Sequence, residues 1–158
     1  MFIKQSLISI LFLLFMQFES HAQIPVNEGG DRFVQVIKAN KFIRIKQDVG
    51  GDLNLLVGSV LMKQNNTLFY CDSAIQNIFI NQIEAFGNIH INDNDSVHTY
   101  SQYMKYDGNS RIAQLKNKVK LTDGKGVLTT ESLEYQVDPK IGTYLEGGKV
   151  VNEKSVLT

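Results

Sequence analysis

Apolar and polar residues alternate along much of this chain. From Phe33 onward, pairs of apolar residues recur with one polar residue between them, as in Ile89 and Ile91 or Val119 and Leu121. A period of two is that of a β-strand with one buried face. Glycines interrupt the chain too often for long helices, and no stretch of about a dozen residues follows a helical period. The pattern predicts an all-β protein.

Short apolar segments also repeat at an interval of about thirty residues. The central residues of four such segments are 29, 30 and 31 positions apart: Val60, Ile89, Val119 and Val150. A second segment follows each one, beginning at Thr67, Ser96, Gly126 and Ser155. Turn-forming Asn, Asp and Gly residues separate the two segments of a unit. A fixed period of this size indicates units that bury their apolar faces by stacking on their neighbours. The sequence therefore predicts stacked antiparallel strands.

The N-terminal residues predict export. Lys4 precedes an apolar run from Leu7 to Met16, and Ser20-His21-Ala22 is a small-x-small cleavage site. This is the pattern of a secretory signal peptide over residues 1–22, cleaved after Ala22. An uncleaved membrane anchor is the alternative. Residues 23–33 contain a proline and a glycine pair and are expected to form a flexible leader, and residues 34–158 are expected to form one domain.

Charge and cysteine content narrow the classes of function. The chain has 16 Lys+Arg and 16 Asp+Glu, so its formal net charge is zero. Nucleic-acid binders present a basic face, and capture by an anionic membrane surface also needs excess positive charge, so neither is expected. The one cysteine, Cys71, leaves no intrachain disulfide. It aligns with Tyr100 and Thr130 in later repeats, which favours a packed thiol over a nucleophile.

Candidate sites for chemistry are weak. His90 and His98 flank the Asp93-Asn94-Asp95 turn, but zinc needs three or four converging ligands. The next repeat has Lys120 and Leu128 at the histidine positions, so solvent-facing histidines are expected. The turn itself lacks the glycine and the glutamate of a calcium loop. No serine lies in a Gly-x-Ser-x-Gly motif. We therefore expect neither an enzyme nor a cofactor or metal site.

The end of the sequence matches the beginning of a further unit. Ser155 to Thr158 aligns with Gly126 to Thr129 and then stops. Either the repeat continues in a longer chain, or the last strand is an open edge. Open edges are usually protected or paired with another chain. We expect either truncation at this end or a partner there.

The repeated residues resemble a known family. Gly87-Asn88-Ile89-His90-Ile91 leads to Tyr103-Met104-Lys105-Tyr106-Asp107, and Val119-Lys120-Leu121 leads to Leu128 to Tyr135. This order is similar to that of the OstA-like or LptA-like family of periplasmic lipopolysaccharide-transport (organic solvent tolerance) proteins, over roughly Val34 to Thr158. The resemblance implies an open twisted β-jellyroll or solenoid with an apolar groove.

Other expectations also follow from the resemblance. The groove would hold the acyl chains of lipid A. Like domains would join end to end through edge strands to form a bridge, with outer-membrane assembly components as further partners. The protein would be periplasmic and would have no active site or cofactor. The alternative is a structural or scaffolding β-solenoid of the cell envelope, with a packed core and no lipid ligand.

Alternation along the strands selects the candidate lining of the groove. The expected inward-facing residues are Val60, Met62, Leu68, Ile89, Ile91, Val97, Val119, Leu121, Val127, Leu133 and Val150. For the second strand of each unit, the sequence leaves two choices of inward-facing residues. There Phe69, His98 and Leu128 have the opposite parity from Leu68, Val97 and Val127, and both sets contain apolar residues.

Overall fold

The computed structural model describes residues 32–144, 146–152 and 155–157, and their regular structure consists of β-strands. Six strands contain 11 or 12 residues: β3 (Leu53–Gln64), β4 (Thr67–Asn77), β5 (Gln82–Asp93), β6 (Val97–Asp107), β7 (Ile112–Thr122) and β8 (Gly126–Gln136). Five are shorter: β1 (Gln35–Lys38), β2 (Lys41–Ile45), β9 (Ile141–Thr143), β10 (Gly148–Asn152) and β11 (Ser155–Leu157). The expected signal peptide, residues 1–22, lies outside the described residues.

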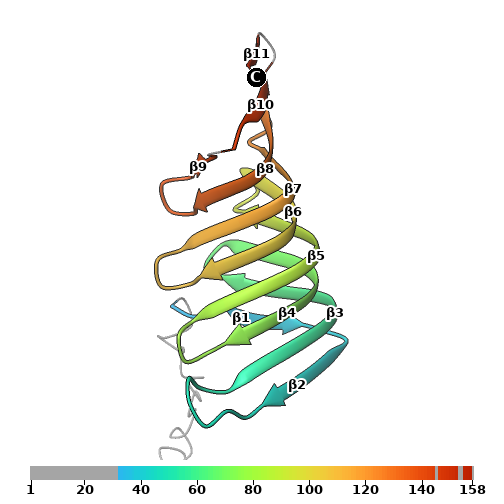
Figure 1. Ribbon diagram of the computed structural model, residues 1–158, viewed down its shortest axis with the longest axis vertical. Coiled ribbons are helices and arrows are strands. Elements are labelled where there is room, and N and C mark those ends of the chain that lie inside the picture. Colours follow the sequence, from blue (N-terminus) through green and yellow to red (C-terminus); the bar gives the residue numbers. More distant parts are fainter. Residues whose placement is uncertain (1–31, 145, 153–154, 158) are drawn as a thin grey trace, which may run out of the picture.

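The strands form one open antiparallel sheet. Its order is β1-β3-β4-β5-β6-β7-β8-β10-β11, with β2 also paired to β3 and β9 also paired to β8 (Figure 1). From β2 to β9 consecutive strands are neighbours, as stacking of successive units requires. The predicted all-β, stacked antiparallel fold is confirmed. In the part of the chain that the structure describes, no helix has the length and hydropathy needed to cross a membrane.

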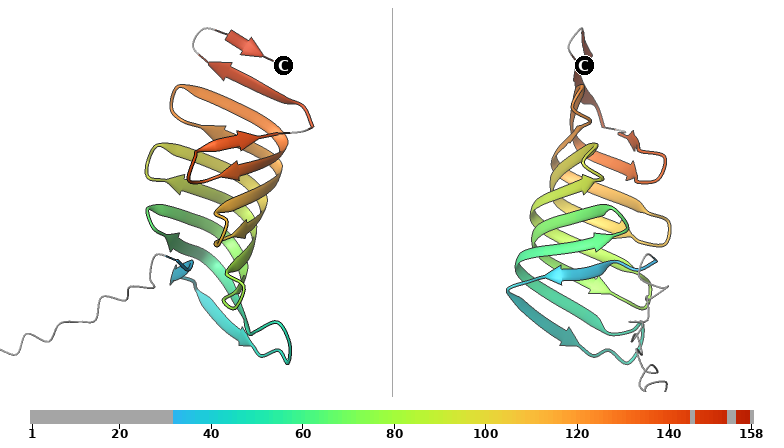
Figure 2. Two further views of the ribbon diagram at one scale, coloured as in Figure 1. Left: turned by 90° about the vertical axis from the view of Figure 1, so that its left-hand side faces the viewer. Right: turned by 180° about the vertical axis from the view of Figure 1, so that it is seen from behind.

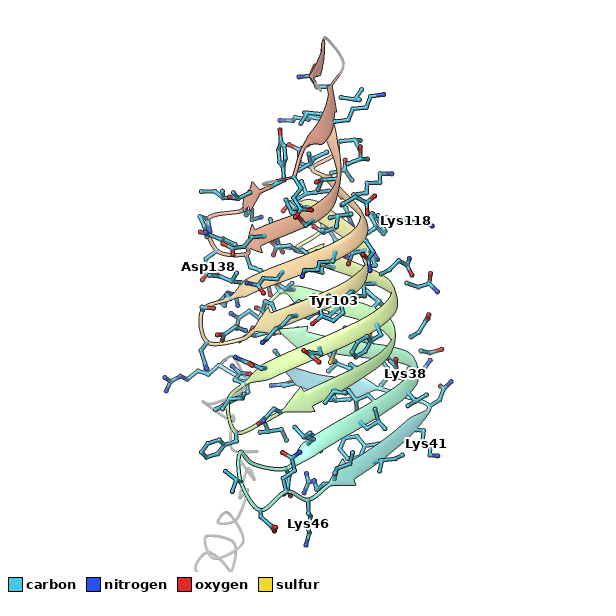
Figure 3. All side chains as sticks on the ribbon, in the orientation of Figure 1. Lys38, Lys41, Lys46, Tyr103, Lys118 and Asp138 are labelled. Atoms are coloured by element: carbon cyan, nitrogen blue, oxygen red, sulfur yellow. The ribbon has the colours of Figure 1, made fainter. Side chains whose placement is uncertain are left out.

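Each long strand bends near its middle, so that the sheet folds over on itself (Figure 2). The register shifts there by a β-bulge, for example between Phe86 and Ile89 of β5. Two consecutive residues have positive φ at each bulge of the odd-numbered long strands, such as Gly87 at 72° and Asn88 at 45°. A bulge adds a residue to one strand and increases its local bend and twist. Figure 3 shows Lys118, a bulge residue of β7, on the side opposite Asp138.

The bend divides the sheet into two halves. We call the part joined by the tight turns 65–66, 94–96 and 123–125 the hairpin half, and the part joined by residues 78–81, 108–111 and 137–140 the loop half. The short strands fit the same division. β1 pairs with the hairpin half of β3 and β2 with its loop half, while β10 and β9 do the same on β8. β1 with β2, and β9 with β10, therefore each take the place of one bent strand that is broken in two, and β11 adds a further short strand beyond β10.

The facing sides of the two halves form the core. Buried side chains from β3 to β8 make one hydrophobic cluster that runs along the stack. The two halves touch directly, since the ring centroids of Phe69 in the hairpin half and Tyr106 in the loop half lie 4.7 Å apart. Because side chains alternate between the two faces of a strand, the opposite face of each half is directed to solvent. We call these the inner and outer faces.

The register corrects two of the sequence alignments. Gly148 pairs with Thr130, which pairs with Val119, so Gly148 takes the position expected for Val150. Val150 instead corresponds to Leu121, 29 positions earlier, since both pair with Leu128. Ser101, not Tyr100, is the counterpart of Cys71. The β5–β6 turn has three residues where the β3–β4 turn has two, and this shifts the later strand by one position.

Candidate functional site

A continuous apolar column lines the inner face of the loop half. Its members come from six successive strands, and strand pairing places each beside the next. Every one is at most 3% exposed: Leu56, Ala74, Ala85, Met104, Leu115 and Leu133. Paired residues in antiparallel strands have neighbouring side chains on one face. The loop half therefore presents an uninterrupted apolar strip about six strands long.

The hairpin half faces this strip with a second column. In order along the stack, its members are Met62, Phe69, Ile91, Thr99, Leu121, Leu128 and Val150. Thr99 is the only polar residue of this column. Its side chain is fully buried, and its hydroxyl has no hydrogen-bond partner among the described residues. A buried hydroxyl without a partner is unfavourable, so this point of the inner face has unused capacity for a polar contact.

Polar residues close the open side of the folded sheet. The Tyr106 hydroxyl donates to Gln64 Oε1 at 2.7 Å, and the Tyr135 hydroxyl donates to Asp93 Oδ2 at 2.9 Å. Both tyrosines are on the loop half, and both acceptors end strands of the hairpin half. Burial is the main cause that raises the pKa of each tyrosine, so both hydroxyls stay protonated donors. We call these two pairs the seam.

Sequence reasoning missed the seam, although a signal was present. Each pair joins residues 42 positions apart, and the two pairs are themselves 29 positions apart in the chain. A donor and an acceptor that recur with the repeat period indicate a structural contact that recurs with it. The Thr67 hydroxyl also donates to Asp93 Oδ1 at 3.1 Å, so Asp93 is part of the interior and not only of a turn.

The N-terminal end of the inner face is covered by the chain itself. Val34 is 4% exposed and belongs to the core. Gln76 Nε2 donates to the Val34 carbonyl at 2.7 Å, and the Val34 amide donates to Asn81 Oδ1 at 3.2 Å. Gln64 Nε2 donates to the Arg32 carbonyl at 2.9 Å. Residues 32–34 thus lie across the two halves and block this end.

The C-terminal end is more open. Gly142 and Gly148 occupy inner-face positions that Ala113 and Val119 fill in the preceding unit. Leu121 and Leu128 are only partly buried there. A cavity of about 410 Å³ lies at the bend of the same region, between β7, β8 and β10, and its lining includes Lys118, Glu131 and Glu146. The inner face is therefore most accessible near β8 to β10.

Nine of the eleven predicted lining residues lie on the inner face: Val60, Met62, Ile89, Ile91, Val97, Val119, Leu121, Leu133 and Val150. The structure places Leu68 and Val127 on the outer face. Leu68 pairs with Lys63 and Asn92, while Phe69, the next residue, is fully buried. Val127 pairs with Thr122 and Val151. The inward residues of the second strands are thus Phe69, Val97 and Leu128.

Cys71 has the character of a packed side chain. It is 5% exposed and faces Val60 in the core. Burial, followed by the nearby Asp72 carboxylate, raises the pKa of the Cys71 thiol to about 12. Because the thiolate is the nucleophilic form, this environment disfavours reaction at Cys71. The structure confirms the expectation of a buried structural thiol.

The histidines lie on the outer face of the hairpin half. His90 Nε2 and His98 Nδ1 are 3.1 Å apart, and the His90 ring stacks on Tyr70 and Tyr100 at centroid distances of 5.4 and 4.5 Å. Partial burial, and secondly His98, lowers the pKa of His90. Among the residues that the structure describes, no three His, Cys, Asp or Glu side chains are grouped so as to hold a metal ion.

Comparisons with known proteins agree with this geometry. Residues 31–158 match the family model described as OstA-like protein. Fifteen chains of solved structures match. One is the crystal structure of LptH from Pseudomonas aeruginosa, described as the LptA homologous periplasmic component of the conserved lipopolysaccharide transport device. It has a TM-score of 0.61 and 16% identity, over 75% of this chain and 87% of that chain. At this identity the likeness shows the fold. No curated protein gives a match.

Proposed function

Because the chain belongs to the OstA-like protein family, we propose that it is an exported periplasmic protein that takes part in lipopolysaccharide transport. The LptH structure, a component of such a transport device, has the same fold. Export rests on the N-terminal pattern of Lys4 and Leu7 to Met16. N-terminal sequencing of the exported protein checks this part, and a first residue of Gln23 is expected.

The inner face would carry the acyl chains of lipid A. The observation that supports this most is the pair of apolar columns, which continue across successive strands without a charged residue. Each methylene group moved from water into such a face contributes about 0.8 kcal/mol, so ten buried methylenes would contribute about 8 kcal/mol. The acyl chains would enter near β8 to β10, where Leu121 and Leu128 are only partly buried.

For an acyl chain to extend further along the inner face, the two halves of the sheet would have to separate. The apolar contacts between them are not directional, so an acyl chain can replace them with contacts of the same kind. The seam hydrogen bonds would keep the strand ends together while the interior widens. In this proposal the unpaired Thr99 hydroxyl is a polar contact available to a lipid ester or hydroxyl group.

A packed scaffold is the second candidate. It is supported by the burial of the inner face between β3 and β7, where side chains such as Met62, Phe69 and Met104 are fully buried and fill the space between the halves. A scaffold of this kind would stabilise an envelope assembly through its surface and would bind no lipid inside.

Photocrosslinking to lipopolysaccharide separates the two candidates. A photoreactive phenylalanine analogue is placed at Leu121 or Leu128, which are partly buried on the inner face, and at Ile91 deeper inside. Lys120 is the matched control, because it is adjacent to Leu121 but exposed. Transport predicts crosslinks from Leu121 and Leu128 and none from Lys120. Equal labelling at all positions would exclude the groove, and no labelling in a folded protein would favour the scaffold.

End-to-end assembly is part of the proposal. β1 and β2 form one end of the sheet, and β9 and β11 the other. Their free edges can pair with another chain by strand addition. Sedimentation velocity at increasing protein concentration tests this. We expect species that grow by one subunit at a time, and a monomer at all concentrations would contradict the assembly.

A further inference from the structure

One turn of the loop half carries apolar residues where the equivalent turn is polar. Residues 78–81, between β4 and β5, read Ile-Phe-Ile-Asn, while residues 108–111, between β6 and β7, read Gly-Asn-Ser-Arg. Ile78, Phe79 and Ile80 are 45%, 77% and 41% exposed. Val49, in the loop between β2 and β3, is 86% exposed. We call Val49, Ile78, Phe79 and Ile80 the apolar tip.

The two loops of the apolar tip are joined. Asn77 Nδ2 donates to the Gly50 carbonyl at 2.9 Å. The first side-chain carbons of Phe79 lie over Gly51, where any Cβ would clash with them. Gly51 has a positive φ of 81° and no side chain, so it lets Phe79 pack closely while most of the ring stays exposed. The tip is thus held in place by its own loops.

Several backbone groups of the turn have hydrogen-bond partners within the protein. The Ile80 amide donates to Asn77 Oδ1 at 3.3 Å, and Asn109 Nδ2 donates to the Ile80 carbonyl at 3.1 Å. The Asn81 amide donates to the Ile78 carbonyl at 3.3 Å. Hydrocarbon surroundings penalise backbone groups that lack partners. The partners of the Ile80 and Asn81 amides and of the Ile78 and Ile80 carbonyls lower this penalty for the turn.

We propose that the apolar tip inserts into the surface of a phospholipid bilayer. Exposed apolar side chains at a convex turn fit the acyl boundary of a membrane, whereas a protein partner would need a matching pocket. The charged residues of the adjoining loop are Lys46, Asp48 and Asp52. Figure 3 shows Lys46 at the β2 end of the molecule. This loop has no excess of positive charge, so insertion is driven by apolar burial and is insensitive to salt.

The path of the chain supports a bilayer as the occupant. Asn81, the last residue of the turn, donates from Nδ2 to the Arg32 carbonyl at 2.8 Å, so the described chain starts beside the apolar tip. The apolar run that ends at Met16 is only 15 residues upstream, a distance of at most about 50 Å in extended chain. While that run occupies a membrane during export, the tip is within reach of the same surface.

A tryptophan probe tests the insertion, because the natural sequence contains none. The full chain is exported with its own N-terminus as Phe79→Trp and, for comparison, as Ile141→Trp. Ile141 is 51% exposed, belongs to β9 and lies far from the tip along the stack (Figure 1). Both proteins are mixed with vesicles of phosphatidylcholine and phosphatidylethanolamine, with and without quenchers attached to the acyl chains. Any contribution of the N-terminus to binding is the same in both.

The expected result is a blue shift and acyl-chain quenching for Phe79→Trp, unchanged by salt, with no change for Ile141→Trp. Three results would overturn the proposal. One is emission from Phe79→Trp that vesicles leave unchanged. The second is equal quenching of both probes. The third is a blue shift without vesicles that grows with protein concentration, which would identify a second copy of the chain as the occupant.

A binding measurement completes the test. Phe79→Ser should lower the partition coefficient onto the same vesicles about tenfold, since it removes one large apolar side chain from the bilayer. Ile141→Ser is the matched control and should leave the coefficient unchanged. Both sites are at least half exposed, so both variants should keep the melting temperature of the parent chain. Equal partitioning of the two folded variants would contradict insertion. The vesicles contain no lipopolysaccharide, so the outcome is independent of the proposed transport function.

Discussion

At the scale of single residues, the seam shows how a mostly apolar interior uses a few polar groups. Asp93 is 4% exposed and accepts from Thr67 and Tyr135, while Gln64 accepts from Tyr106 and donates to two carbonyls. A hydrogen bond to a charged group contributes more than one between neutral groups. The Tyr135–Asp93 pair should therefore contribute more to the free energy of unfolding than a surface contact does.

We predict that Tyr135→Phe lowers the free energy of unfolding by about 1–3 kcal/mol, because the buried Asp93 carboxylate loses a donor. Tyr144→Phe is the control. Tyr144 is 39% exposed, and removal of its hydroxyl should change the free energy by less than about 0.5 kcal/mol. Urea denaturation at pH 7 measures both. Equal effects of the two substitutions would show that the seam hydrogen bond contributes little.

The pH dependence gives a second readout of the same contact. Burial, and then the hydrogen bond and charge of Asp93, raises the pKa of Tyr135 above its ordinary value of 10.0. The unfolded phenol loses its proton first as the pH rises past that value. Stability due to Tyr135 is thus complete below pH 10 and decreases above it. Tyr135→Phe should show a smaller decrease than the parent chain.

At the scale of the strands, the bulges decide where the sheet bends. Gly87 is the first of two β5 bulge residues with positive φ, and a Cβ there would clash with the Asp72 carboxylate of β4. The Asn88 side chain donates to the same carboxylate from Nδ2 at 2.9 Å. Close approach of the two strands at the bend thus depends on a residue without a side chain.

We predict that Gly87→Ala destabilises the fold by more than Gly124→Ala. Gly124 has a similar positive φ of 84°, but a Cβ there would meet no atom within 4 Å. Gly124→Ala should therefore lower the free energy of unfolding only by the conformational penalty of about 1–2 kcal/mol.

Gly87→Ala has the same conformational penalty and, in addition, a steric clash between the new Cβ and the Asp72 carboxylate. Asp72→Ala in the Gly87→Ala background should recover part of the loss, as measured by denaturation of all four proteins. No recovery would mean that the penalty is conformational alone.

At the scale of the whole molecule, the fold is a linear stack in which each strand pairs only with its neighbours in the sheet, while a few side-chain contacts join strands two or three places apart across the bend. Stability in such a stack is approximately the sum of local units and their interfaces. The interior is well filled from β3 to β8, whereas the residues of β9 are all exposed and those of β10 mostly so. The C-terminal end should thus open more readily than the centre.

We predict that amide hydrogen exchange is slowest in β4 to β7 and at least about tenfold faster in β9 and β10, because local opening exposes few apolar contacts at that end. Mass spectrometry of peptides after timed exchange measures the gradient. A valine at Gly148 would crowd the Tyr144 and Leu128 side chains, which a Cβ at this position already meets. Loss of lipopolysaccharide binding in Gly148→Val would connect the readily opened C-terminal end to the proposed groove. Uniform protection along the chain would instead indicate one cooperative unit.

Much of the strand pattern could be predicted from particular residues. The alternation at Ile89 and Ile91 placed β5, and the repeat period placed its neighbours in order. Which residues of β4 and β8 face inward could not be predicted. Successive residues there are both apolar, as Leu68 and Phe69 show. The length of each turn decides the register, and the additional residue of the β5–β6 turn shifts β6 by one position relative to β4, which reverses the expected face along that strand.

What the sequence alone determined is local: the strands, their antiparallel order and the apolar character of one face, all of which follow from contacts between residues close in the chain. Only the tertiary structure decided which face is buried, where the sheet folds, and that Gln64 meets Tyr106 and Asp93 meets Tyr135. These contacts join residues 42 positions apart across a bend. They depend on the summed twist and register of several strands, which no single segment encodes.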